Sequence, residues 1–195
     1  ARGRWDSALA AAARFTKLTG NITGLREEYG YAAVAAWLGA LPDSVAAARR
    51  ARLEPNLDRL SNLERSEVLW LDGIRASARG DSAGLRSARA TLNRFLTSSG
   101  FADSIRRVPE RSLAAFSLAL EGRRDEAGRQ LADLKWALAD TLPFPWWWPS
   151  PWAPGIQRLV ASRWLAAAGD TAQAVRLLRW VDAEVIAPSL MRPNL

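Results

Sequence analysis

The sequence predicts an all-α fold, organised as an α-solenoid of about five helical hairpins in a single domain that spans residues 1–195. Two features predict it. Apolar residues recur at steps of three and four along most of the chain, as in helices that pack on their neighbours, and no segment alternates as a strand would. Glycines recur at long intervals, each ending one Ala- and Leu-rich segment and shortly preceding another.

The hairpin turns are predicted near residues 3, 39–43, 80, 122 and 169. Their glycines lie 36, 41, 42 and 47 residues apart. The segments that carry them are "RGRWDSAL" (2–9), "WLGALPDSVA" (37–46), "RGDSAGL" (79–85), "EGRRDEA" (121–127) and "AGDTAQA" (168–174). The second turn contains Leu41 and Pro42 as an insertion and is the least regular of the five.

Each turn holds the residue types that a helical hairpin needs. The glycine adopts the left-handed conformation that ends the first helix, and an Asp, Ser or Thr then caps the second helix. Five residues after the glycine, four of the turns carry a small or apolar residue that lets the two helices approach: Ala8, Leu85, Ala127 and Ala174.

The helices on both sides of the last three turns carry a continuous apolar stripe. Around Gly80 its members are Leu63, Trp70, Leu71, Ile74 and Ala78, then Leu85, Ala88, Leu92 and Phe95. Around Gly122 they are Leu113, Phe116 and Leu120, then Ala127, Leu131, Leu134 and Leu138. Around Gly169 they are Ile156, Leu159, Val160, Arg163, Trp164 and Ala167, then Ala174, Leu177, Leu178, Val181 and Val185.

These turns resemble the tetratricopeptide repeat (TPR) family. "EGRRDEAGRQL" (121–131) is similar to the turn and second-helix start of that motif, with Gly122 and Ala127 at its small positions. "GRWDSAL" (3–9) and "AGDTAQAVRLL" (168–178) follow the same pattern, and "ARLEPN" (51–56) looks like a repeat end at which Pro55 stops the helix. The spacings exceed the family's 34 residues.

The resemblance implies a right-handed TPR-like solenoid with an incomplete first hairpin. It also implies that the chain is the C-terminal repeat region of a larger bacterial multidomain protein, followed by a short tail at 188–195. Such arrays form grooves that bind a peptide or protein partner. The groove candidates that could engage acidic groups of a partner are Arg75, Arg79, Arg111, Arg158 and Arg163.

A Pro/Trp-rich loop at 142–154 contains "PFPWWWPSPWAP" and has no counterpart in the family. The prolines hold the backbone extended, so the consecutive indoles point in different directions. The loop is either a plug that packs on its own hairpins, a contact site for a partner, or a membrane or sugar platform. Its candidate contact residues are Trp146, Trp147, Trp148 and Trp152. By contrast, Trp37, Trp70 and Trp164 are predicted to pack in the core.

The chain has no His and no Cys, which excludes Ser-His-Asp and Cys-His nucleophiles and the usual zinc sites. No phosphate-binding glycine motif occurs. We therefore expect no catalytic residue, cofactor or metal. Acids at helix ends, such as Glu121, Asp125, Glu126 and Asp170, are explained by capping.

A carbohydrate-active alternative would pair the Trp cluster with Asp140 and Glu121.

The formal net charge of +7 leaves a nucleic-acid-associated helical repeat as another alternative. The excess is spread along the chain, and its only dense run is Arg49, Arg50 and Arg52, which fits a solvated helix face.

No apolar run approaches the roughly 18 residues of a membrane span. The sequence does not specify the compartment or the oligomeric state; the cytoplasm is slightly favoured over an extracytoplasmic part of a membrane-anchored protein.

Overall fold

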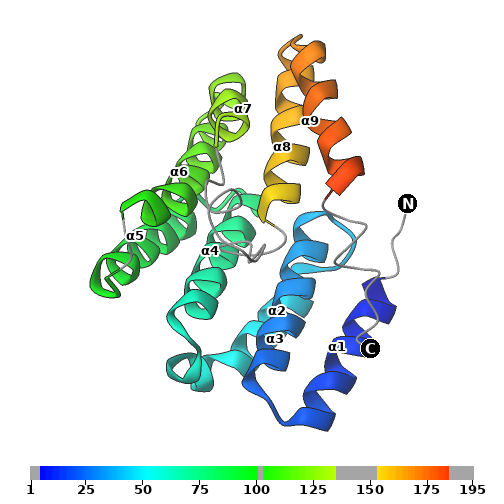
Figure 1. Cartoon of the computed structure of the whole chain (residues 1–195), viewed down its shortest axis with the longest axis vertical. Helices are drawn as coiled ribbons and strands as arrows, with labels where there is room; N and C mark the ends of the chain where they lie inside the picture. The colour runs from blue at the N-terminus through cyan, green and yellow to red at the C-terminus, as the bar shows by residue number, and fades with distance from the viewer. Residues whose placement is uncertain (1–4, 101–102, 135–152, 185–195) are drawn as a thin grey trace. The chain divides into compact units, whose positions relative to one another are not determined.

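The computed structural model describes residues 5–100, 103–134 and 153–184, and every regular element within these ranges is a helix (Figure 1). The all-α prediction is confirmed. The chain divides into two compact units, Ala1–Gly100 and Phe101–Leu195.

In the first unit each helix packs on the next helix or on the one after it. Helix α2 contacts α1, α3 and α4, and α4 contacts α5. The elements are α1 (Trp5–Thr19), α2 (Ile22–Trp37), α3 (Asp43–Leu53), the 3₁₀ helix η1 (Glu54–Arg59), α4 (Asn62–Ala78) and α5 (Ser82–Ser98). As expected, α3 ends shortly before Pro55, which is the second residue of η1.

In the second unit α6 packs on α7, α7 on α8 and α8 on α9. Their bounds are Asp103–Leu120, Arg124–Ala132, Ala153–Ala167 and Thr171–Glu184. Helix α6 contains Pro109, which cannot donate a backbone hydrogen bond inside the helix. The Pro/Trp-rich loop falls almost entirely within residues 135–152, outside the described ranges.

Left-handed glycines end the helices, as predicted at four of the five turns. Their φ angles are 71° at Gly39, 68° at Gly80, 86° at Gly122 and 91° at Gly169. Gly3 lies outside the described residues. Two further turns of the same kind, at Gly20 (57°) and Gly100 (71°), were not predicted.

The capping prediction is confirmed at two turns and wrong at two. Asp81 accepts a hydrogen bond from the backbone of α5, and Asp170 accepts one from the backbone of α9. The N-caps of α3 and α7 are Pro42 and Arg123, which make no side-chain capping bond. Both helices instead carry acidic residues in the first turn, where negative charge stabilises the exposed N–H groups.

The core of the first unit lies mainly between α2, α4 and α5. Trp70 and Tyr29 are completely buried there, together with Leu71, Ile74, Leu85, Leu92 and Leu96. Leu63 was placed on the same apolar stripe but is 50% exposed at the start of α4. Helices α1 and α2 approach closely at Gly24, where a Cβ would lie 2.9 Å from the Thr16 Cα.

The core of the second unit is centred on the contact between α6, α7 and α8. Phe116 and Trp164 meet edge to face, with ring centroids 5.6 Å apart. Gly128 allows α7 to approach α8 at Trp164 and Leu165. Three described positions of the predicted stripe are exposed instead: Arg163 and Ala167 on α8 and Leu178 on α9.

The tryptophans predicted to lie in the core are buried to different extents. Trp70 has no exposed surface, which confirms its prediction, whereas Trp37 and Trp164 are half-buried. Trp5 begins α1 and is also half-buried.

Candidate functional site

A cavity of about 360 Å³ lies between α3, α4 and α5 in the first unit. Three of its lining residues are arginines and one is an aspartate. The described lining residues are Arg50, Leu69, Asp72, Arg75, Ala76, Arg79, Gly84, Ser87, Ala88 and Thr91. We call this the arginine cavity.

Helical periodicity explains how one wall of the arginine cavity is assembled. Asp72, Arg75 and Arg79 follow each other at steps of three and four along α4 and its C-terminal cap, so they share one face. The opposite wall is the α5 face that carries Gly84, Ser87, Ala88 and Thr91, whose small side chains leave the space open. Arg50 comes from the last turn of α3.

Acidic residues hold two of the guanidinium groups in place. Arg50 Nε donates to both carboxylate oxygens of Asp72, at 3.1 and 3.0 Å, and a second nitrogen of Arg50 pairs with Glu54. Arg75 donates to both oxygens of Asp43 at 2.9 Å each. The two-point contact of Arg75 with Asp43, and the contacts of Arg50 with Asp72 and Glu54, fix the direction of each guanidinium before any partner arrives.

Arg79 is held more loosely than the other two arginines. Its contacts to Asp43 and Asp81 are 3.3 and 3.4 Å long, and its side chain is 40% exposed, against 9% for Arg75. Exposed ion pairs of this length contribute little to stability. Arg79 is therefore the arginine of the cavity that can turn toward a partner at the smallest conformational cost.

Burial and hydrogen bonding set the protonation states around the cavity. Burial, reinforced by the charge of Asp72, raises the pKa of the Tyr29 hydroxyl well above its usual value, and this hydroxyl donates to Asp72 at 2.5 Å. Burial also raises the pKa of Asp72, although Arg50 and Tyr29 act in the opposite direction. The hydrogen bonds from Arg75 lower the pKa of Asp43, which is therefore ionised at neutral pH.

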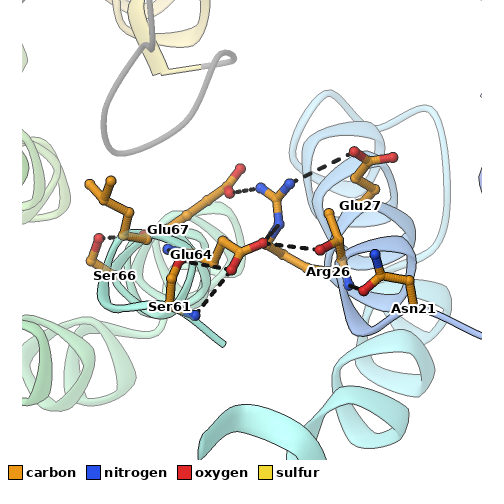
Figure 2. A network of polar contacts seen from close by, with 9 residues as sticks. Asn21, Arg26, Glu27, Ser61, Glu64, Ser66 and Glu67 are labelled. Atoms are coloured by element: carbon orange, nitrogen blue, oxygen red, sulfur yellow. Dashed lines mark hydrogen bonds and ion pairs between the residues drawn. The ribbon is translucent and has the colours of Figure 1, made fainter. Parts of the chain in front are cut away.

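A second polar network lies between α2 and α4. Arg26 reaches from α2 toward Glu67 and Glu64 of α4 and also contacts Glu27 (Figure 2). Glu64 in addition accepts from Ser61 in the capping box of α4. One guanidinium here faces three carboxylates, so this network is a structural link between helices and offers nothing to an acidic partner.

The structure brings together two of the five predicted groove arginines, Arg75 and Arg79. The other three belong to the second unit: Arg111 and Arg163 are exposed, and Arg158 is half-buried. The loop candidates Trp146, Trp147, Trp148 and Trp152 lie outside the described residues, as does Asp140.

Two charged members of the arginine cavity, Arg50 and Asp72, were not predicted as site residues, and neither were its uncharged lining residues. Arg50 had been assigned to a solvated helix face, but its side chain is only 18% exposed. Asp72 could have been predicted from its spacing, because it lies on the same face of one helix as Arg75 and Arg79. Nothing comparable in the sequence indicates the approach of α3.

Within the described ranges, no group of three or more acidic residues is arranged to hold a metal ion. None of the described helices is long and apolar enough to cross a membrane. No protein-family model matches the chain, and comparison with curated proteins and with solved structures finds no significant similarity to either.

Proposed function

We propose that this chain is a non-catalytic protein-interaction module, a TPR-like solenoid that binds a peptide or protein partner and uses the arginine cavity as a contact point. The helix pairs α2–α3, α4–α5, α6–α7 and α8–α9, each joined at a left-handed glycine, support the repeat architecture. The main observation that supports the proposed function is the arginine cavity, which is lined by three arginines.

The chemistry of the arginine cavity favours a partner that brings hydrogen-bond acceptors. Guanidinium groups only donate, and three of them line the cavity. Asp72 is the one carboxylate in its described lining; the others that pair with these arginines, Asp43, Glu54 and Asp81, lie outside that lining. Ser87 and Thr91 add hydroxyl groups. An acidic side chain together with a backbone carbonyl is the complement that a peptide provides.

The same arrangement favours a single acidic group over a nucleic acid. Within the described part of the first unit, most arginines near the cavity already contact carboxylates: Arg49 and Arg52 pair with Glu28, and Arg50 pairs with Asp72. A nucleic-acid surface needs several cations free to replace counter-ions along a backbone. A cavity with pre-oriented donors fits one carboxylate better.

The test is a selection of short random peptides against the wild-type chain, followed by affinity measurements on the selected peptides. We expect Asp- and Glu-containing peptides to be enriched. Arg79→Gln should weaken their binding about tenfold, the effect of losing one charge-assisted hydrogen bond. Ser87→Phe should do the same by filling the cavity without changing any charge.

Arg94→Gln is the matched control, because Arg94 is exposed on α5, lies outside the cavity lining and carries the same charge as Arg79. This variant should bind as the wild type does. Equal losses in the two arginine variants would show a non-specific charge effect and refute the proposal. Tight binding of DNA or RNA oligonucleotides that falls steeply with added salt would establish the nucleic-acid alternative.

The contribution of the loop is tested separately by the double variant Trp147→Ala and Trp148→Ala. If the loop contacts the partner, binding is lost while the melting temperature changes little. If it is a plug, the free energy of unfolding falls by about 3–5 kcal/mol, as expected for truncating buried tryptophan.

A further inference from the structure

Asp72 places a carboxylate in the wall of the arginine cavity, on the same face of α4 as Arg75 and Arg79. Its side chain is 24% exposed, so part of it is open to the space. Arg50 Nε donates to both of its oxygens, at 3.1 and 3.0 Å, and the Tyr29 hydroxyl donates to one of them at 2.5 Å. An acidic group that enters the cavity therefore meets Asp72 as well as the arginines.

Two of the cavity's cations are grouped with Asp72 around one buried ring. The guanidinium carbons of Arg50 and Arg75 lie 6.0 and 5.9 Å from the centre of the Tyr29 ring, which is completely buried. Arg50 uses its Nε for Asp72 and a second nitrogen for Glu54, which is 63% exposed outside the described lining. A carboxylate of a partner that binds Arg50 from the cavity must therefore share this cation with Asp72.

Two carboxylates that share one cation in a partly buried place do not both stay ionised easily. A second negative charge nearby favours the protonated form of a carboxyl group, and the effect is stronger where water is excluded. Burial already raises the pKa of Asp72 in the free chain, against the opposing effects of Arg50 and Tyr29. The arrival of a further carboxylate raises this pKa again, so Asp72 is the group that takes a proton.

The neighbouring titratable groups do not compete for this proton. Burial raises the pKa of Tyr29 on α2, which therefore stays neutral. Hydrogen bonds from Arg75 lower the pKa of Asp43 on α3, and the backbone N–H of Gly84 lowers the pKa of Asp81, so both aspartates stay ionised. Helix α5 contributes no charged residue to the described lining.

We propose that the arginine cavity takes up one proton from solvent when it binds an acidic partner, and that Asp72 receives this proton. Neutral Asp72 no longer competes for Arg50, whose positive charge becomes available to the partner's carboxylate. When the partner leaves, Arg50 returns to Asp72 and the proton returns to solvent. This coupling makes the affinity for the partner depend on pH, and it rests on the function proposed above for the cavity.

The direction of the pH dependence follows from the sign of the shift. The pKa of Asp72 is higher in the complex than in the free chain, so the affinity rises as the pH falls from the first value to the second. The rise is at most about tenfold for each pH unit, because one proton is taken up. At still lower pH the affinity falls, because the partner's own carboxyl, with an ordinary pKa of about 4.3 for glutamate, becomes protonated.

The experiment uses the full 195-residue chain and the tightest-binding selected peptide that carries a single carboxylate. Calorimetry in two buffers with different ionisation enthalpies, repeated from neutral to mildly acid pH, counts the protons exchanged on binding. We expect net uptake that approaches one proton per peptide, together with a higher pKa of Asp72 in the complex when its carboxyl is followed by NMR. The same peptide with its acid replaced by the amide should cause no uptake.

Two substitutions test whether Asp72 is the acceptor. Binding to Asp72→Asn should take up no proton, and the affinity of this variant should not rise as the pH falls. Asp58→Asn is the control, because Asp58 is 91% exposed and lies outside the described cavity lining. This variant should take up the same number of protons as the wild type.

The possible failures of the coupling and of the proposed function can be told apart. A wild-type chain that binds acidic peptides without proton uptake at any of these pH values would overturn the coupling alone. Proton uptake that persists in Asp72→Asn, or an Asp72 pKa that is the same in the free and bound wild type, would do the same. The second measurement needs no variant to fold. If no acidic peptide binds, the proposed function is refuted, and the coupling is refuted with it.

Discussion

Replacing Asp43 with asparagine should destabilise the protein, because Arg75 would lose the carboxylate that satisfies it. Two nitrogens of Arg75 donate to the two Asp43 oxygens at 2.9 Å each, and Arg79 reaches one of them at 3.3 Å. The Arg75 side chain is only 9% exposed, so water cannot replace the lost acceptor. Asparagine offers one neutral oxygen in place of two charged ones.

The size of the stability loss depends on how deeply Asp43 and Arg75 are buried. Losing a hydrogen bond to a charged group costs about 1.5–3 kcal/mol, while an exposed pair is worth about 0–1 kcal/mol. Asp43 is 36% exposed and Arg75 is nearly buried, so solvent screening reduces the upper figure without removing the effect. Asp43 also lies in the first turn of α3, where its charge adds about 0.3–1 kcal/mol. We expect a loss of about 2 kcal/mol at neutral pH.

The loss should depend on pH in a defined direction. The hydrogen bonds of Arg75 hold the pKa of Asp43 below its ordinary value of 3.8. A carboxyl whose folded pKa is depressed contributes its full stability above the unfolded pKa, and the contribution disappears as the pH falls through the folded pKa. The difference between wild type and Asp43→Asn should therefore be constant near neutrality and shrink below about pH 4.

Urea unfolding, followed by circular dichroism from neutral to acid pH, measures both quantities. Asp58→Asn is the control, because Asp58 pairs with Arg65 at 2.8 Å but is 91% exposed. Its stability should equal that of the wild type. The reasoning fails if the two variants are indistinguishable at neutral pH, or if the Asp43→Asn difference persists undiminished in acid.

Three more substitutions test the packing of the first unit. Trp70→Ala should lower the free energy of unfolding by about 3–5 kcal/mol in urea titrations, because this side chain has no exposed surface; a loss below 1 kcal/mol would contradict its place in the core. Gly24→Ala should be destabilising by about 1–3 kcal/mol, because the new Cβ would meet the Thr16 backbone; a net gain from helix propensity would show that α1 moves aside. Ser61→Ala should cost about 1 kcal/mol and raise the pKa of Glu64 measured by NMR, since burial raises that pKa and the hydrogen bonds of Ser61, together with Arg26 and Thr23, lower it below its ordinary value; an unchanged pKa would argue against the capping box.

The helix ends were partly predictable because glycine acts locally. Gly39, Gly80, Gly122 and Gly169 were found from their own few neighbours, and their left-handed conformations follow from the lack of a Cβ. Gly20 ends a helix in the same way. Gly20 was not predicted because it does not fit a spacing of roughly forty residues, whereas the backbone requires only a residue that tolerates positive φ.

Burial was less predictable than helix position. An apolar stripe predicts which face of a helix packs against its neighbour, but it does not predict where along that face the neighbouring helix ends. Leu63 at the start of α4 and Leu178 on α9 follow the stripe and are still exposed, at 50% and 42%. Which turns of a stripe are covered depends on contacts between helices, and the spacing along one helix does not contain that information.

The arginine cavity shows the same limit for the candidate site. The steps between Asp72, Arg75 and Arg79 could be counted in the sequence, and two of these three residues were predicted. Arg50 could not be found in this way, because it reaches the site only through the packing of α3 against α2, with α2 in turn packed on α4. When a site is formed by residues from three helices, the spacing along one helix predicts only the residues that this helix contributes.

The volume of the arginine cavity depends on the absence of large side chains from one face of α5. Gly84, Ser87, Ala88 and Thr91 share one face of that helix, and all are small. Leucines at these positions would have filled the space beside Arg50, Arg75 and Arg79. Small residues keep the guanidinium donors accessible, and Asp43 and Asp72 keep two of them fixed in direction. For this reason Ser87→Phe is the more decisive variant of the peptide experiment: it leaves every charge and every ion pair in place and removes only the volume.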